Sequence, residues 1–425
     1  MRKIFCIICP LVMLYFPLQA QDIGYARKII DTLSSPSMHG RGYVNNGDRI
    51  ASAFIRNEFI KDSLKNFASD YYQTFKLPIG TLPGKVMVSV NETTLTPGVD
   101  YLVAAASPTM IGTFKIVRID SHVVCNKKLF RKLLKSKNKE KFILIDKKGI
   151  SDKTILATLH GIKEMNTLGA KGIIVIDDKL VWGEEDALTP LTYPIITLKR
   201  ASLFANMKTM TVDIVQDFQN AHEFANVVGY IEGSTKPDSF VVFTAHYDHL
   251  GQMGSDIYFP GANDNASGTA MILDLAKYYS KNKPDYSIAF MSFTGEELGL
   301  KGSEYYTSHP LFPLSKIRFL VNLDMVGTGD DGIKVVNGAV IPKEFNLLSG
   351  INDKMKYLPS VNKRGEAAIS DHYFFYKKGV KSFFIYTLGG IGEYHNIYDK
   401  SKTLPLTKYN ELFKLIIDFE KALND

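Results

Sequence analysis

Five side chains of the types that bind zinc follow apolar runs in the second half of the chain: His246, Asp264, Glu297, Asp324 and His395. Two imidazoles and three carboxylates make a mixed nitrogen and oxygen donor set, which suits zinc. A single catalytic zinc with an open position uses three protein ligands, so five exceed its needs. Two metal ions that share a bridging carboxylate need this many. The sequence therefore predicts a site for two zinc ions, of the kind that activates water for hydrolysis.

Asp264 is the residue that we expect to bridge the two ions. It lies in the segment GANDNASG, which reads as a tight turn directly before a helix. Backbone N–H groups at the start of a helix favour negative charge. We therefore expect neighbouring amide groups to hold both oxygens of this carboxylate.

Three residues beside the ligands are candidates for catalysis. Asp248 lies two positions after His246, so both side chains of an extended chain point the same way, and the carboxylate is expected to accept the second N–H of the imidazole. Glu296 directly precedes Glu297, and adjacent side chains diverge, so Glu296 is predicted to be the general base that takes a proton from the attacking water. Tyr394 is predicted to donate its hydroxyl to the oxyanion of a tetrahedral intermediate.

The remaining histidines lack this context. His249 is expected to face away from His246 and Asp248, and His372 is interpreted as a structural cap of a helix. We treat the others as ordinary: His39, His122, His160, His222 and His309.

The candidate ligands follow strand-like runs that alternate with helical segments. Apolar runs predict strands, and amphipathic stretches predict helices; the strands are expected at 227–231, 240–245, 287–293, 319–323 and 382–388, and the helices at 269–279, 298–308 and 407–423. This alternation predicts an α/β fold with a mostly parallel sheet covered by helices on both faces. Ligand sites in such sheets lie beyond the carboxyl ends of the strands, so we expect the five ligands to converge at one edge.

The segment 86–217 has a different texture, with short strand-like runs and one clear helix at 154–168. It reads as a small β-rich domain without a set of ligand-type residues. Its acidic segment 182–186, which contains Trp182, is interpreted as a plain surface loop rather than as a cover over a neighbouring site. The expected division is a catalytic domain built from 21–85 and 218–425, with 86–217 inserted; two helices near the start of the first piece pack on the later sheet.

The first twenty residues have the pattern of a secretory signal peptide. Arg2 and Lys3 precede an apolar run, and Ala20 supplies the small residue before a cut. The segment 1–20 is thus expected to be removed after Ala20, which predicts a secreted or periplasmic protein without a membrane span. Cleavage leaves Cys125, which cannot form an internal disulfide and is expected to be buried as a small apolar side chain.

Charge is only mildly positive, with a formal net charge of +7 over 425 residues. Most of the excess lies between Lys127 and Lys141, where leucines at helical spacing accompany the basic residues. No aromatic stacking partners or nucleic-acid motif accompany this run, so we predict a solvated helix face and no nucleic-acid partner.

The motifs AHYDHLG, PGANDNASGTA, TGEELGLKGS, VNLDMVG and YHNIYD occur in this order. Together they resemble the secreted co-catalytic di-zinc peptidases related to aminopeptidase Y and the glutamate carboxypeptidases. The segments LGAKGIIVID and YPIITL are similar to the protease-associated domain that many of these peptidases carry as an insertion. The run YHNIYDK departs from the more usual YHTPED, which leaves the role of Asp399 open.

The resemblance implies a role for each motif residue. It places His246, Asp264 and Asp324 on one zinc ion, and Asp264, Glu297 and His395 on the other. It also implies that Glu296 is the base.

The expected activity is that of a metallo-aminopeptidase, which hydrolyses N-terminal residues from a peptide substrate. Alternatives on the same fold are a single-zinc glutaminyl cyclase, a carboxypeptidase or dipeptidase, and a catalytically inactive receptor module. No arginine cluster that would bind a substrate carboxylate accompanies the motifs, although Arg364 could reach the site.

Overall fold

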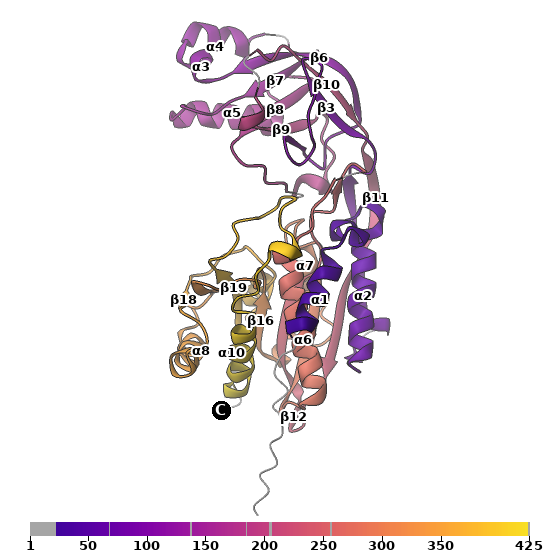
Figure 1. Cartoon of the computed structure of the whole chain (residues 1–425), viewed down its shortest axis with the longest axis vertical. Coiled ribbons are helices and arrows are strands. Elements are labelled where there is room, and N and C mark those ends of the chain that lie inside the picture. The colour runs from indigo at the N-terminus through magenta and orange to yellow at the C-terminus, as the bar shows by residue number, and fades with distance from the viewer. Residues whose placement is uncertain are drawn as a thin grey trace, which may run out of the picture.

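The structure is a computed structural model that describes residues 23–67, 69–136, 138–183, 185–203, 206–255 and 257–423. The predicted signal peptide, 1–20, and its cleavage site after Ala20 lie outside the described residues. Two units, each built on its own sheet, follow one another along the long axis of the molecule (Figure 1).

The larger unit contains a nine-stranded sheet. Its order is β1 (Lys65–Asn66), β11 (Asp217–Ile231), β15 (Tyr286–Phe293), β12 (Lys236–His246), β16 (Ile317–Leu323), β19 (Ser382–Leu388), β17 (Gly332–Val336) and β18 (Val361–Lys363), and β2 (Tyr72–Thr81) pairs with β11. The strands β15, β12, β16 and β19 at its centre run parallel, while β11 and β17 on either side of them pair antiparallel. The predicted mostly parallel α/β sheet is confirmed for this centre, and the flanks make the whole sheet mixed.

Helices cover both faces of this sheet, which explains why its central strands are apolar on both sides. Val241 and Phe243 of β12 point into one core, and Val242 between them points into the other. The first core is closed by α1 (Ile23–Leu33), α2 (Gly47–Lys61), α6 (Gly268–Lys281), α8 (Pro342–Met355) and α10 (Tyr409–Ala422); the second is closed by α7 (Lys301–Ser308) and α9 (His372–Lys377). As predicted, the first two helices pack on the later sheet, where Figure 1 shows them beside α6.

The smaller unit contains an eight-stranded sheet. Its order is β4 (Thr93–Thr94), β3 (Val86–Val90), β10 (Thr209–Ile214), β6 (Met110–Ile119), β7 (Lys141–Ile145), β8 (Gly172–Asp177), β9 (Ile195–Lys199) and β5 (Tyr101–Val103). The predicted helix is present as α5 (Lys153–Met165), and the basic run forms α4 (Lys127–Leu134), as its helical spacing predicted. Only α3 (Ser121–Cys125) adds helix, among the described residues of this unit, that the sequence pattern did not reveal.

The exposed end of the smaller unit carries the basic run. The lysines at the start of α4 are exposed, as expected for a solvated helix face. The expectation that Cys125 is buried is wrong: Cys125 is the last residue of α3 and is exposed. A five-residue helix at the surface cannot turn every side chain toward the core, and α3 buries Val124 instead.

None of the described helices has the length and apolar character that crossing a bilayer requires. The short strands β13 (Gln252–Met253) and β14 (Ile257–Tyr258) form a separate pair close to the end of β12.

Candidate metal centre

The carboxyl ends of the central strands bring the predicted site residues together. β12 ends at His246, β15 is followed by Glu296 and Glu297, and β16 is followed by Asp324. The loop after β19 carries His395 back to the same edge. Segments that are far apart in the chain thus meet where parallel strands end, as such folds dictate.

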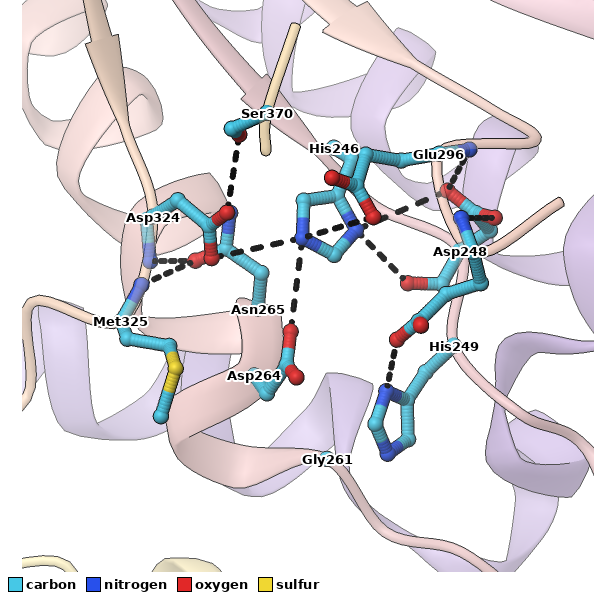
Figure 2. Close-up of polar contacts among 12 residues, drawn as sticks. His246, Asp248, His249, Gly261, Asp264, Asn265, Glu296, Asp324, Met325 and Ser370 are labelled. Atoms are coloured by element: carbon cyan, nitrogen blue, oxygen red, sulfur yellow. Dashed lines mark hydrogen bonds and ion pairs between the residues drawn. The ribbon is translucent and has the colours of Figure 1, made fainter. Parts of the chain in front are cut away.

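His246 lies at the centre of this group. Its Nε2 atom is 3.4 Å from Oδ1 of Asp264, 3.4 Å from Oδ1 of Asp324 and 4.0 Å from Oε2 of Glu296. Figure 2 shows the three carboxylates arranged around the imidazole. One buried nitrogen therefore shares its surroundings with three acidic side chains.

Asp264 connects this group to a second imidazole. Its other oxygen, Oδ2, lies 3.1 Å from Nε2 of His395, which is also 3.1 Å from Oε2 of Glu297. The two oxygens of one carboxylate thus face imidazoles from two different loops. This is the arrangement that a carboxylate bridging two cations requires.

The charge of the site fits divalent cations. Asp264, Glu296, Glu297 and Asp324 are buried or nearly so, and none of the described lysines or arginines forms an ion pair with any of them. Even two protonated imidazoles would leave two of these four negative charges uncompensated, and burying unpaired charge is costly. Donor atoms of His246, Asp264 and Glu297, and of His246, Glu296 and Asp324, lie within 4.8 Å of one another, so these residues suit metal ions.

The pKa shifts of His395 and Asp264 also indicate that the site suits cations. Burial lowers the pKa of His395, but the charge of Glu297 and the hydrogen bond to Asp264 outweigh it and raise this pKa to about 11. Burial raises the pKa of Asp264, yet hydrogen bonds from His246 and His395 hold it well below its usual value. Both effects show that the site favours positive charge beside Asp264, which a bound cation would supply.

Glu296 differs from the other carboxylates. Burial is the main cause that raises its pKa well above the usual value, and the nearby His246 opposes the shift. Its carboxyl group therefore holds a proton more readily than an ordinary glutamate does.

A cavity of about 560 Å³ opens beside these residues, between the two units. Glu296, Glu297, Tyr394 and His395 line it from the larger unit, and Leu102, Ala104, Lys163, Val181, Trp182 and Ile195 line it from the smaller one. The ring of Tyr394 stacks on that of His395 with centroids 3.8 Å apart, and this tyrosine is 45% exposed.

Comparison with known proteins identifies the larger unit. Residues 226–419 match peptidase family M28. This segment is an M28 peptidase domain.

Curated relatives of this chain include proteins that are named as aminopeptidases. Aminopeptidase YwaD of Bacillus subtilis is 32% identical over 181 residues, which is 39% of this chain and 36% of that protein. Leucine aminopeptidase 2 of Arthroderma otae is 31% identical over 140 residues, or 32% of this chain and 27% of that protein. The matched segment thus spans only about a third of these curated relatives.

Solved structures extend the likeness to both units. BSAP, a zinc aminopeptidase from Bacillus subtilis, superposes with a TM-score of 0.69 at 20% identity, covering 93% of this chain and 93% of that one. At this identity the likeness establishes a shared fold, and it includes the eight-stranded unit as well as the M28 domain.

Asp248 was expected to contact only His246, but it also contacts the turn that carries both glutamates. Its Oδ1 lies 3.6 Å from Nδ1 of His246, but its own backbone oxygen is closer to that nitrogen, at 3.2 Å. The carboxylate also accepts the backbone N–H groups of Glu296 and Glu297, at 3.3 and 3.4 Å, and the hydroxyl of Tyr43. Asp248 therefore ties the end of β12 to the turn that carries both glutamates.

The expectation that backbone amides hold the Asp264 carboxylate is wrong. The N–H groups of Asn263 and Asp264 donate to the carboxylate of Asp399 instead, at 2.9 and 3.0 Å. Asp399, to which no role could be assigned from the sequence, is fully buried and fixes the turn from outside. The turn is a helical segment, Ala262–Ser267, whose backbone points these amides away from the cluster.

His249 was expected to face away from His246 and Asp248 and to lie outside the site, and the second part of this expectation is wrong. Its Nδ1 atom lies 2.8 Å from Oε1 of Glu297, and its buried ring lies 5.7 Å from that of His395. The side chains of an extended strand alternate, but β12 ends at His246 and the chain then turns toward Gly251, whose φ is +75°. The rule of alternation therefore does not apply to His249.

Arg41 is a contributor that the sequence did not reveal. It is fully buried, and its guanidinium donates five hydrogen bonds, all to backbone oxygens: those of Leu33, Tyr247, Pro260, Gly261 and Asp264. Four of these five oxygens belong to the loops that carry His246 and Asp264. In the sequence, Arg41 belongs to the segment HGRG, which reads as an ordinary turn and gives no indication of this role.

Three further expectations need correction. Trp182 does not belong to a plain surface loop, because it is 3% exposed and contacts the site. His372 is the first residue of α9 rather than a cap before it, and its ring lies buried beside Phe384. Arg364 is exposed, contacts the hydroxyl of Tyr386 and does not line the cavity.

Proposed function

We propose that this protein is a zinc-dependent aminopeptidase that hydrolyses N-terminal residues from peptides. The observation that carries the proposal is the placement of Asp264, whose two oxygens face His246 at 3.4 Å and His395 at 3.1 Å. The printed names of relatives, an aminopeptidase, a leucine aminopeptidase and a zinc aminopeptidase, support the same activity.

Five residues would hold two zinc ions. His246, Asp264 and Asp324 would hold one ion, and Asp264, Glu297 and His395 the other, with Asp264 shared. When bound, the pair would lower the pKa of a water molecule toward ~7 and polarise the scissile carbonyl.

Two side chains would then handle protons and charge. Glu296 lines the cavity beside the ligands, and its raised pKa suits a group that accepts a proton from the attacking water and passes it to the leaving amine. The hydroxyl of Tyr394 would donate to the oxygen of the tetrahedral intermediate. Asp248 would position His246 and the two glutamates rather than react.

The cavity between the two units would receive the peptide. Its walls carry apolar side chains of the smaller unit beside the reactive edge of the M28 domain. We interpret the smaller unit as a protease-associated domain inserted at 86–217 between two pieces of the catalytic domain, 21–85 and 218–425. A leader cut after Ala20 would direct the mature protein to the periplasm or out of the cell.

The test is a substrate panel combined with metal counting. Aminoacyl p-nitroanilides should be hydrolysed, N-acetylated versions should resist, and elemental analysis should find two zinc ions per chain. The Glu296→Gln variant should lose about 100-fold or more in kcat while it keeps both ions. Glu366→Gln, at an exposed glutamate paired with Lys377, is the matched control and should behave as the wild type.

Other outcomes would identify other activities. One tightly held zinc ion together with cyclisation of N-terminal glutamine would identify a glutaminyl cyclase. Cleavage from the carboxyl end, or of dipeptides alone, would identify a carboxypeptidase or dipeptidase. Full activity of Glu296→Gln would refute the role of this residue.

A further inference from the structure

Trp182 connects the eight-stranded unit to the metal centre. We propose that it is a positioning residue for His395, so that the second zinc ion depends on a loop that the M28 domain does not contain. This inference rests on the proposed function, because it takes His395 as a zinc ligand.

The first observation is a reciprocal backbone contact. The N–H group of Trp182 donates to the backbone oxygen of His395 at 2.9 Å, and Nδ1 of the His395 ring lies 2.8 Å from the backbone oxygen of Trp182. A carbonyl oxygen can only accept, so the imidazole must carry its proton on Nδ1. In the neutral ring the lone pair is then on Nε2, which faces Asp264 and Glu297 and is the atom that would bind a metal ion.

The second observation is that the loop around His395 has little support of its own. No regular helix or strand is formed between β19 and the short 3-10 helix Ser401–Thr403. His395 has a left-handed backbone with φ +50°, which residues other than glycine adopt only where their surroundings hold them. The contact from Trp182 provides such a hold.

The third observation explains what keeps Trp182 in place. Its indole Nε1–H donates to the backbone oxygen of Val103 in β5 at 2.7 Å. Its ring stacks on Phe259, with centroids 4.5 Å apart and planes at 23°. Phe259 lies shortly before the turn that carries Asp264, so the indole joins the smaller unit to two of the three loops that would hold the second ion.

The same loop also forms a wall of the substrate cavity. Val181, Trp182 and Gly183 line it opposite Glu296 and Tyr394. The residue proposed to orient the ligand would thus lie beside a peptide bound in this cavity, and the smaller unit would form part of the catalytic site.

Zinc affinity tests this inference independently of activity. Stepwise titration of metal-free protein against a competing chelator should resolve two binding events in the wild type. Trp182→Ala keeps the backbone groups that contact His395 but removes the indole contacts that hold them in place. One event should therefore weaken about 10-fold or more while the other is unchanged, since correctly held partners of zinc-bound histidines are worth about 10–100-fold in affinity. Trp182→Phe keeps a ring on Phe259 but loses the indole N–H, and should show an intermediate weakening.

The chain offers a second measurement, because Trp182 is its single tryptophan. Indole emission of the wild type should change with the event that involves His395, and His395→Ala should abolish that change. Phe142→Leu removes a fully buried ring in the core of the smaller unit, far from the loop in sequence, and is the control for general destabilisation.

The outcomes separate the two proposals. A wild type that does not bind two zinc ions overturns the proposed function. If the wild type binds two ions and both Trp182 variants bind each ion as tightly as the wild type does, only the positioning role is overturned. The same holds if Phe142→Leu weakens zinc binding as much as Trp182→Ala does. If Trp182→Ala does not fold, Trp182→Phe and the emission of the wild type decide.

Discussion

Nδ1 of His249 lies 2.8 Å from Oε1 of Glu297, inside the buried metal centre. The other oxygen of Glu297 lies 3.1 Å from Nε2 of His395. The contact with His249 therefore determines which oxygen of Glu297 is turned toward the second imidazole.

A substitution series at His249 should reveal this role. His249→Ala should lower kcat/KM by about 10–100-fold, because the carboxylate loses the partner that orients it. His249→Asn places an amide near the position of Nδ1 and should retain more activity. Steady-state kinetics and zinc titration measure both variants, and His160→Ala, at a largely exposed histidine, is the control. Equal loss in the alanine and asparagine variants would mean that packing, not orientation, is responsible.

Arg41 should be essential for stability. Burial lowers its pKa to about 10, and the charges of Asp264 and Asp399 oppose that shift, so the guanidinium stays charged at neutral pH. Arg41→Ala removes a donor from five buried carbonyl oxygens, of which that of Gly261 also accepts from the N–H of Ala266, and should lower the free energy of unfolding by about 3 kcal/mol or more.

Denaturant unfolding with the chelator present isolates this effect from zinc binding. Arg41→Lys should recover only part of the loss, since one ammonium group has three donors and no planar fork. Arg364→Ala, at an exposed arginine, is the matched control. A wild-type midpoint in Arg41→Ala would contradict the structural role of the guanidinium.

Asp399 should act through the turn that carries Asp264. Burial raises its pKa to about 6, while the hydrogen bonds from Asp264 and Asn263 favour the charged form. Asp399→Ala leaves two buried N–H groups without an acceptor and should cost about 2 kcal/mol of stability. It should also lower zinc affinity, whereas Asp399→Asn, which keeps one acceptor oxygen, should lose less. Thermal melts and zinc titration are the measurements, with the exposed Asp238→Ala as reference.

His372 should make the fold sensitive to acid. Burial lowers its pKa to about 4, whereas the ordinary value, expected in the unfolded chain, is 6.5. As the pH falls, the unfolded chain therefore binds the proton before the folded protein does. The contribution of neutral His372 to the free energy of unfolding is complete above pH 6.5 and is lost as the pH falls toward 4. The shift corresponds to about 3 kcal/mol.

Unfolding curves between pH 4 and 7 check this prediction. His372→Phe keeps a ring beside Phe384 but cannot be protonated, so its stability should vary less over this window. The pH dependence of His160→Ala should remain that of the wild type. An unchanged slope in His372→Phe would assign the acid sensitivity to other groups.

Local patterns were sufficient to predict the α/β fold and the types of residue at the site. Strands such as β12 and β15 are buried on both faces, so each is a continuous apolar run that can be recognised without knowing its neighbours. The polar residue that follows such a strand, for example His246 or Asp324, is then placed at the sheet edge by topology alone. For this reason the candidate ligands could be named before their distances were known.

Only the tertiary structure revealed the residues that hold those ligands in place. Arg41 contacts the backbone of Asp264 across 223 positions of the chain, and Trp182 contacts His395 across 213. A hydrogen bond to a backbone oxygen cannot be recognised from the residue type of the acceptor, because every residue has that oxygen. The amino-acid sequence by itself thus determined which side chains end at the sheet edge, and the packing of distant loops decided how those side chains are oriented.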